Sequence, residues 1–277
     1  MDFSLLAGHP LYAATGLAYL AAFVCYALAW KSTNAAFGKA GTGLMAVALA
    51  GNAGLILARW LEAGRPPFKS LFESLVFLSF CIAAVYLLHE RVHRTRVFGF
   101  AAAVGAFGVM LFALTKWDAE IVKLPPALQS GWFVPHVVVY FLGYAAMFLA
   151  AAFSVFQLFK PTLSLRAGTV LRGEISIEDL AYETTRFGFV LLTFGLLVGA
   201  VWAKSAWGDY WVWDPKENWA LVSWLIYASY LHLRHVKSWR GKRAAWLSIA
   251  GFAAMMFTYL GMELLPTAAE SVHVYIN

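Results

Sequence analysis

The chain has 277 residues, of which 61% are hydrophobic and only 13% are charged. A soluble domain is nearer half apolar and a quarter charged, so the composition excludes an ordinary soluble protein and indicates a membrane protein with several spans. The net charge of +6 does not indicate nucleic-acid binding, because the sequence has no long Lys/Arg-rich face and its basic residues are distributed like topology signals.

Eight apolar runs are long enough to cross a bilayer, for which about 20 apolar residues suffice. We therefore predict an all-α, polytopic membrane protein with about eight transmembrane helices that form a single membrane domain over residues 1–277. The predicted spans are residues 10–30, 39–58, 71–89, 97–115, 135–158, 187–204, 218–236 and 244–262.

The distribution of Lys and Arg predicts the orientation of these spans. Most of the 21 basic residues fall in the connections that are inside when the N-terminus is outside. The positive-inside rule then places both termini on the external, periplasmic side of a bacterial cytoplasmic membrane.

The connection over residues 59–73 also falls outside, and Ser70 with Glu73 predicts a capping box that opens the third span. The inner connection over residues 159–186 is polar, and we interpret it as a surface helix and a turn.

An aromatic stretch separates the sixth and seventh predicted spans. Residues 207–217 read Trp-Gly-Asp-Tyr-Trp-Val-Trp-Asp-Pro-Lys-Glu, with three tryptophans and a tyrosine in seven residues. Such density favours a shelf for a flat, partly apolar ligand, because an interfacial belt would spread its aromatics over many helix ends. Asp214, Pro215 and Glu217 follow in the order of N-cap, first helical residue and capping-box acid, so we interpret Asp214 mainly as a cap.

Two histidines are predicted on the same external side as the aromatic stretch. His136 begins the fifth span, and His273 lies in the C-terminal tail. Two neutral imidazoles beside an aromatic shelf would suit the axial positions of a planar metallomacrocycle such as haem. For either histidine alone, an ordinary interfacial residue is the alternative.

His232 has a different position along the seventh predicted helix. Counted from Pro215, it lies roughly 25 Å along the helix axis, in the inner half of the bilayer. An ionisable residue at such a depth indicates a functional site. The alternative is a helix-end histidine that reaches the inner headgroups, since Arg234 and His235 follow. Both interpretations remain open at this point.

The aromatic stretch resembles a known family signature. Trp207-Gly208-x-x-Trp211-x-Trp213-Asp214 is similar to the WWD motif of membrane proteins that handle haem in cytochrome c maturation. The continuation to His232 and the segment 68–79 are most similar to the CcsA/ResC branch, System II. This resemblance implies that the protein receives haem b inside, moves it across the membrane and presents it outside for attachment to the CxxCH motif of apocytochrome c.

The resemblance also implies roles for individual residues. His136 and His273 would ligate the iron at the external site, and His232 would ligate it at a transit site within the membrane. The WWD segment, residues 205–219, would contribute further haem-binding residues, namely Trp207, Gly208, Trp211, Trp213 and Asp214. No catalytic side chain is expected, because a thiol of the substrate adds across each haem vinyl group by itself once it is held in place.

The implied protein is a subunit of a holocytochrome c synthase. Its expected partners are a CcsB/ResB-type membrane subunit, apocytochrome c, membrane lipid and a thiol-reducing protein, with no nucleic acid among them. Three alternatives stay open. They are a haem exporter or chaperone that does not attach haem, a quinone-linked electron-transfer subunit with a permanent haem, and a transporter of an unrelated solute.

Overall fold

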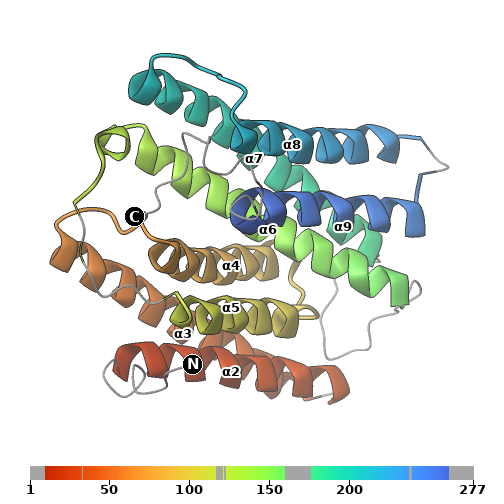
Figure 1. Ribbon diagram of the computed structural model, residues 1–277. Helices are drawn as coiled ribbons and strands as arrows, with labels where there is room; N and C mark the ends of the chain where they lie inside the picture. Colours follow the sequence, from red (N-terminus) through yellow and green to blue (C-terminus); the bar gives the residue numbers. More distant parts are fainter. Residues whose placement is uncertain are drawn as a thin grey trace. The chain divides into compact units, whose positions relative to one another are not determined.

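The computed structural model describes residues 10–32, 34–116, 121, 123–159, 176–236 and 239–261 (Figure 1). These residues form eight α-helices and no strand, as predicted. The α-helices are α2 (Pro10–Lys31), α3 (Ala35–Ala63), α4 (Leu71–His93), α5 (Gly99–Leu114), α6 (Phe133–Phe159), α7 (Ile177–Trp207), α8 (Pro215–Arg234) and α9 (Lys242–Met256). A 3-10 helix, η1 (Pro126–Gln129), precedes α6, and a π-helix, η2 (Phe257–Gly261), follows α9.

The helices agree with the prediction of a polytopic membrane protein. Six of the helical segments in the described part of the chain are long and apolar enough to cross a membrane, with α9 and η2 counted as one. α5 is apolar but has only 16 residues. α8 has 20 residues, but polar and charged side chains at both its ends lower its hydropathy.

The start of α7 differs from the prediction. The sixth span was expected to begin at residue 187, after a surface helix and a turn, but α7 already begins at Ile177. The hydroxyl of Ser176 accepts a hydrogen bond from the amide of Asp179, and Glu178 and Asp179 occupy the first turn. An N-cap and acidic residues in the first turn stabilise a helix start, so residues 177–186 extend the span instead of forming a separate element.

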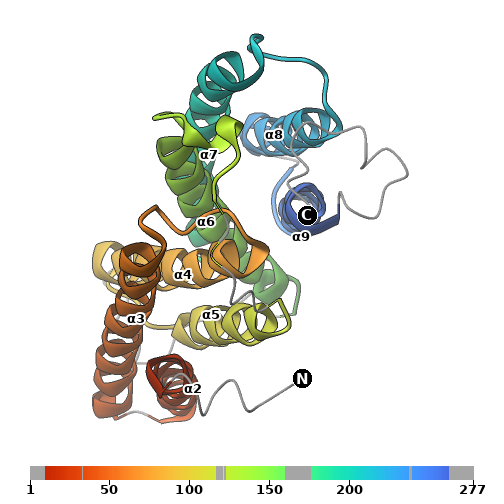
Figure 2. The same cartoon turned by 60° about the vertical axis from the view of Figure 1, so that its left-hand side comes forward.

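The chain divides into two compact units, of which the first contains α2, α3, α4 and α5. α5 lies between α2 and α4 in both views (Figures 1 and 2). At the start of α4, Ser70 and Glu73 form the predicted capping box. The buried carboxylate of Glu73 also accepts hydrogen bonds from Arg59 at 3.2 Å and from Arg65 at 3.0 Å. The predicted cap is therefore confirmed, and its acid also ties the connection 59–73 to α4.

A buried carboxylate connects the helices at the other end of α4. Glu90 accepts hydrogen bonds from the hydroxyls of Tyr26 at 2.8 Å and Thr42 at 2.6 Å, and from Nε of Arg96 at 2.9 Å. Its charge is thus paired and hydrogen-bonded, which is the condition under which a buried charge is tolerated. The network joins α2, α3 and α4 inside the first unit.

The second unit contains α6, α7, α8 and α9 with η1 and η2. The long helices α6 and α7 pack against each other, α9 packs on α6 and α8, and α8 contacts α7. We call one end of this unit the tryptophan end. It comprises the start of α6, the segment 207–214, the start of α8 and η2. At the opposite end, Arg234 of α8 pairs with Glu178 of α7 at 3.1 Å.

Candidate functional site

His136 lies at the tryptophan end, as the fourth residue of α6. Its Nδ1 is 2.8 Å from the carbonyl oxygen of Gly195 on α7. A carbonyl oxygen can only accept, so Nδ1 carries the proton and donates, and the lone pair of the neutral imidazole is on Nε2. Metal-binding histidines typically have this arrangement, in which the second ring nitrogen donates to a carbonyl or a carboxylate. The Nδ1 side of His136 is therefore hydrogen-bonded in the way that is typical of metal-binding histidines.

Trp202 of α7 holds the imidazole from a second side. Its ring is stacked with that of His136 at a centroid distance of 5.5 Å and an interplanar angle of 22°. Trp202 is buried, and its Nε1 donates a hydrogen bond to the carbonyl of Ala127 at 2.8 Å. The ring of Trp207 lies edge-on to Trp202 at 4.9 Å. Trp202 thus connects His136 to the predicted aromatic shelf, a role that the sequence analysis missed.

Gly208 ends α7 and turns the chain toward the rest of the shelf. Its φ is 93°, a left-handed conformation that glycine adopts without strain, and its amide donates to the carbonyl of Lys204. The ammonium of Lys204 donates to the carbonyl of Gly208 and lies 5.5 Å from the ring centroid of Tyr210. In this structure Gly208 is accordingly a helix cap, which positions the residues that follow.

Trp213 is the most exposed tryptophan of the stretch, with 68% of its surface accessible. Its φ is 60°, which is a strained value for a bulky residue. Glu217 holds this conformation from both sides, because its Oε2 accepts hydrogen bonds from the amides of Val212 at 2.9 Å and Asp214 at 3.2 Å. The carbonyl of Trp213 accepts a further bond from the side chain of Asn218 at 2.9 Å. Strain maintained in this way is typical of functional sites.

Trp211 and Asp214 complete the stretch. The half-buried ring of Trp211 lies edge-on to Trp213 at 5.8 Å, and its Nε1 has no hydrogen-bond partner in the described part of the chain. Asp214 is buried, and its carboxylate accepts a bond from the amide of Lys216 at 2.8 Å. Asp214 and Glu217 form the predicted capping box, so the interpretation of Asp214 as the cap of α8 is confirmed.

Replacing Trp213 by glycine should separate the function of the indole from stability. Glycine relieves the positive φ but is more flexible in the unfolded chain, so we expect the free energy of unfolding to change by no more than about 1 kcal/mol. Loss of the exposed ring should instead weaken ligand retention at the tryptophan end. Thermal unfolding in detergent and the content of bound haem measure the two effects.

The control for this substitution is Trp246→Ala in α9. Trp246 is similarly exposed, at 61%, but lies in the first turns of α9, away from the tryptophan end. It should leave bound haem unchanged. Equal haem loss in both variants would show that the indole of Trp213 has no specific role.

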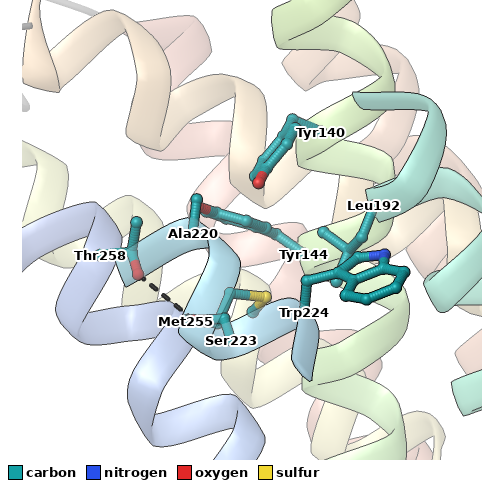
Figure 3. A pocket seen from close by; sticks show the side chains of 8 residues that line it. All are labelled: Tyr140, Tyr144, Leu192, Ala220, Ser223, Trp224, Met255 and Thr258. Atoms are coloured by element: carbon teal, nitrogen blue, oxygen red, sulfur yellow. Dashed lines mark hydrogen bonds between the residues drawn. The ribbon is translucent and has the colours of Figure 1, made fainter. Parts of the chain in front are cut away.

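A narrow pocket lies inside the second unit, next to Tyr140, which follows His136 by one helical turn. It contains about 220 Å³ of empty space, and its enclosed part admits a water-sized molecule but no macrocycle. Tyr140 directs its hydroxyl toward Tyr144, and the hydroxyls of Ser223 and Thr258 are 3.3 Å apart (Figure 3). The other lining residues are Leu192, Ala220, Trp224 and Met255. This pocket is therefore too narrow to hold a planar macrocycle.

Of the other two predicted ligands, the structure places His232 away from His136 and does not describe His273. His232 is exposed and lies in the last turn of α8, at the end of the second unit opposite to His136. His273 lies outside the described residues. The structure thus brings together His136, Trp202 and Trp207, and it places His232 roughly 25 Å along α8 from Pro215.

Comparisons with known proteins agree with the sequence and the fold. The family described as "Cytochrome C assembly protein" matches residues 68–269. The cytochrome c biogenesis protein CcsA of Synechococcus elongatus is 35% identical, over 85% of this chain and 86% of its own. CcsA of Gloeobacter violaceus is 34% identical, over 93% of this chain and 94% of its own. CcsA of Chlamydomonas reinhardtii is 38% identical, over 80% of this chain and 64% of its own.

A solved structure shares the fold. The cytochrome c haem lyase CcmF superposes on 94% of this chain with a TM-score of 0.68 and 19% identity. This chain spans about half of CcmF, or 47% of its length. At this identity the likeness concerns the fold alone, whereas the CcsA relatives match most of the chain in sequence. The chain therefore belongs to the cytochrome c assembly protein family, as a multi-pass membrane protein of the CcsA type that serves cytochrome c maturation.

Proposed function

We propose that the chain binds haem b at the tryptophan end of its second unit and presents it for attachment to the CxxCH motif of apocytochrome c. The observation that carries this proposal is the imidazole of His136, whose Nδ1 donates to Gly195 at 2.8 Å and whose Nε2 carries the lone pair. Trp202 connects His136 to Trp207, and the rings of Trp207, Trp211 and Trp213 in the segment that follows would offer apolar faces to the macrocycle.

His273 is the proposed second axial ligand. η2 ends at Gly261, twelve residues before His273 in sequence, and a chain of that length spans up to about 40 Å when extended. Contacts with α8 hold η2 at the tryptophan end, where the rings of Trp219 and Phe257 are 4.5 Å apart. The tail is therefore long enough to bring His273 to the face of the haem opposite His136.

Attachment needs no catalytic side chain from this protein. Each cysteine thiol of the substrate adds across one haem vinyl group, so a C–S bond forms, the thiol hydrogen goes to the other vinyl carbon, and no electrons are exchanged with a third group. The protein contributes by holding the vinyl edge where the thiols arrive. The histidine of CxxCH can then replace one of the two axial histidines, which releases the product.

We propose that the tryptophan end faces the exterior of a bacterial cytoplasmic membrane, with both termini on that side. Basic residues support this orientation, because Arg234, Lys242 and Arg243 gather at the opposite end of the second unit. His232 also lies at that end, where it would ligate haem that enters from the inside. In this proposal the two units act as one membrane domain over residues 1–277.

The proposed partner is a CcsB/ResB-type membrane subunit, without which the chain should bind haem but attach it poorly. The test uses cells that lack their own cytochrome c maturation genes and express a reporter cytochrome. Haem that stays on the reporter in a denaturing gel measures attachment. We expect covalent haem with both subunits, little with this chain alone, and none when both cysteines of the reporter are replaced by alanine.

Two outcomes would contradict parts of this proposal. Strong attachment by this chain alone would remove the need for the partner. Haem bound to the purified chain, but no attachment even with the partner present, would favour the haem exporter or chaperone.

A further inference from the structure

Two glycines of α7 form the surface on which His136 rests. Gly195 and Gly199 are one helical turn apart and face α6, as in the G-x-x-x-G pattern that lets membrane helices approach closely. A Cβ atom on Gly199 would lie 2.7 Å from both Cε1 and Nδ1 of His136. A Cβ atom on Gly195 would lie 2.2 Å from Cδ2 of Tyr140. Both rings therefore lie directly on the backbone of α7.

This close approach is what permits the hydrogen bond from His136. The imidazole reaches the carbonyl of Gly195 at 2.8 Å only because no side chain at position 199 lies in its way. A carbonyl oxygen has two lone pairs, so it can accept this bond in addition to a helical one. Tyr140 at 5.1 Å and Trp202 at 5.5 Å limit the movement of the ring on its other sides.

We infer that Gly199 is a positioning residue for the haem ligand: by leaving the surface of α7 bare, it sets the tautomer of His136 and the direction of Nε2. This inference rests on the proposed function of His136 as an axial ligand. It gives the G-x-x-x-G pattern a role beyond helix packing. A methyl group at position 199 would push the imidazole away from Gly195 and turn Nε2 away from the iron.

The first test is the Gly199→Ala variant of the full chain, purified in detergent from cells with ample haem. Loss of the residue that orients a metal-binding histidine typically weakens metal binding by roughly 10- to 100-fold. We expect haem retention to fall by at least roughly tenfold, with the remaining haem shifted to a five-coordinate, high-spin spectrum. Exogenous imidazole should restore the low-spin spectrum, since the rest of the site is intact.

Two glycines provide matched controls. Gly188 lies on the same helix, eleven residues before Gly199, and its Cβ would meet Ala146 of α6 at 3.0 Å. Gly251 of α9 would place a Cβ 2.9 Å from the ring of Tyr227. Gly188→Ala tests the packing of α6 on α7, and Gly251→Ala tests a comparable clash with an aromatic ring. Haem loss in these variants equal to that in Gly199→Ala would overturn the inference, because it would be a general effect of packing.

A double-mutant comparison tests whether Gly199 acts through His136. In a His136→Gly background supplied with imidazole, the free ring is not tethered to α6 and can shift away from the added methyl group. Adding Gly199→Ala to this background should therefore change haem retention by less than about twofold, because coupled substitutions are not additive. A further tenfold loss would show that Gly199 acts independently of His136 and would overturn the inference.

The failure of this inference and that of the proposed function have different signatures. If His136→Ala lowers haem retention and Gly199→Ala resembles the two controls, only the inference fails. If His136→Ala retains haem with an unchanged spectrum, both fail. If Gly199→Ala does not fold, ¹⁵N NMR of histidine-labelled wild-type protein tests the inference, because it shows which ring nitrogen of His136 carries the proton. It should show His136 protonated at Nδ1, and protonation at Nε2 instead would overturn the inference.

Discussion

Purified His136→Ala protein is expected to retain at least roughly tenfold less haem than the wild type. The substitution removes a nitrogen ligand that the structure fixes through Gly195 at 2.8 Å and through the stacked ring of Trp202. The cavity it leaves is bordered by aromatic rings, so imidazole added to the medium should restore part of the bound haem. The ratio of haem to protein, measured after extraction into pyridine, reports the effect.

His235→Ala is the control for this substitution. His235 follows the last residue of α8, at the end of the second unit opposite to His136, and it is exposed. Its replacement should leave the haem content unchanged. An undiminished haem content in His136→Ala would eliminate His136 as a ligand, and an equal loss in both variants would point to a general defect in assembly.

Replacing Glu217 by alanine is expected to lower both stability and haem retention. The change leaves the amides of Val212 and Asp214 without their acceptor, and an unsatisfied buried amide costs about 1 to 3 kcal/mol. Because the amide of Val212 is only partly buried, we expect a loss of about 2 to 3 kcal/mol in the free energy of unfolding. Without the two hydrogen bonds to the carboxylate of Glu217, the backbone of Trp213 should leave its positive φ. The exposed indole would then no longer be held in place.

Glu183→Ala is the matched control, and thermal unfolding in detergent is the measurement. Glu183 is an exposed acid of α7 whose pair with Arg186 at 3.1 Å lies at the surface. Such pairs contribute less than about 1 kcal/mol, so its loss should hardly change the unfolding temperature. Equal destabilisation by both substitutions would contradict the claim that Glu217 stabilises the segment through its hydrogen bonds to Val212 and Asp214. Unchanged haem retention in Glu217→Ala would show that the orientation of Trp213 does not matter for binding.

Much of the fold could be predicted because its signals are local. Apolar runs of sufficient length indicate spans, and both capping boxes, at Ser70–Glu73 and Asp214–Glu217, follow from residue order alone. The early start of α7 was missed because four charged residues within 177–186 suggested a separate surface element. Hydropathy could not reveal that Ser176 caps a helix that continues into the membrane.

The site could be predicted only in part, because its decisive contacts are not local. His136 and its acceptor Gly195 are 59 residues apart, and Trp202 was hidden within a predicted span. The G-x-x-x-G spacing of Gly195 and Gly199 was a usable signal for close packing, but it does not say which side chain of the neighbouring helix fills the gap. Likewise, the tryptophans predicted a shelf, whereas the strain at Trp213 emerged only from the backbone.

The visible absorption spectrum of the purified wild-type protein, oxidised and then reduced with dithionite, tests the central claim most directly. Two histidine ligands produce low-spin, six-coordinate haem, so the reduced protein should show sharp, separate α and β bands without added imidazole. A protein that remains colourless when haem synthesis is ample and the CcsB/ResB-type partner is co-expressed would contradict haem binding at the tryptophan end.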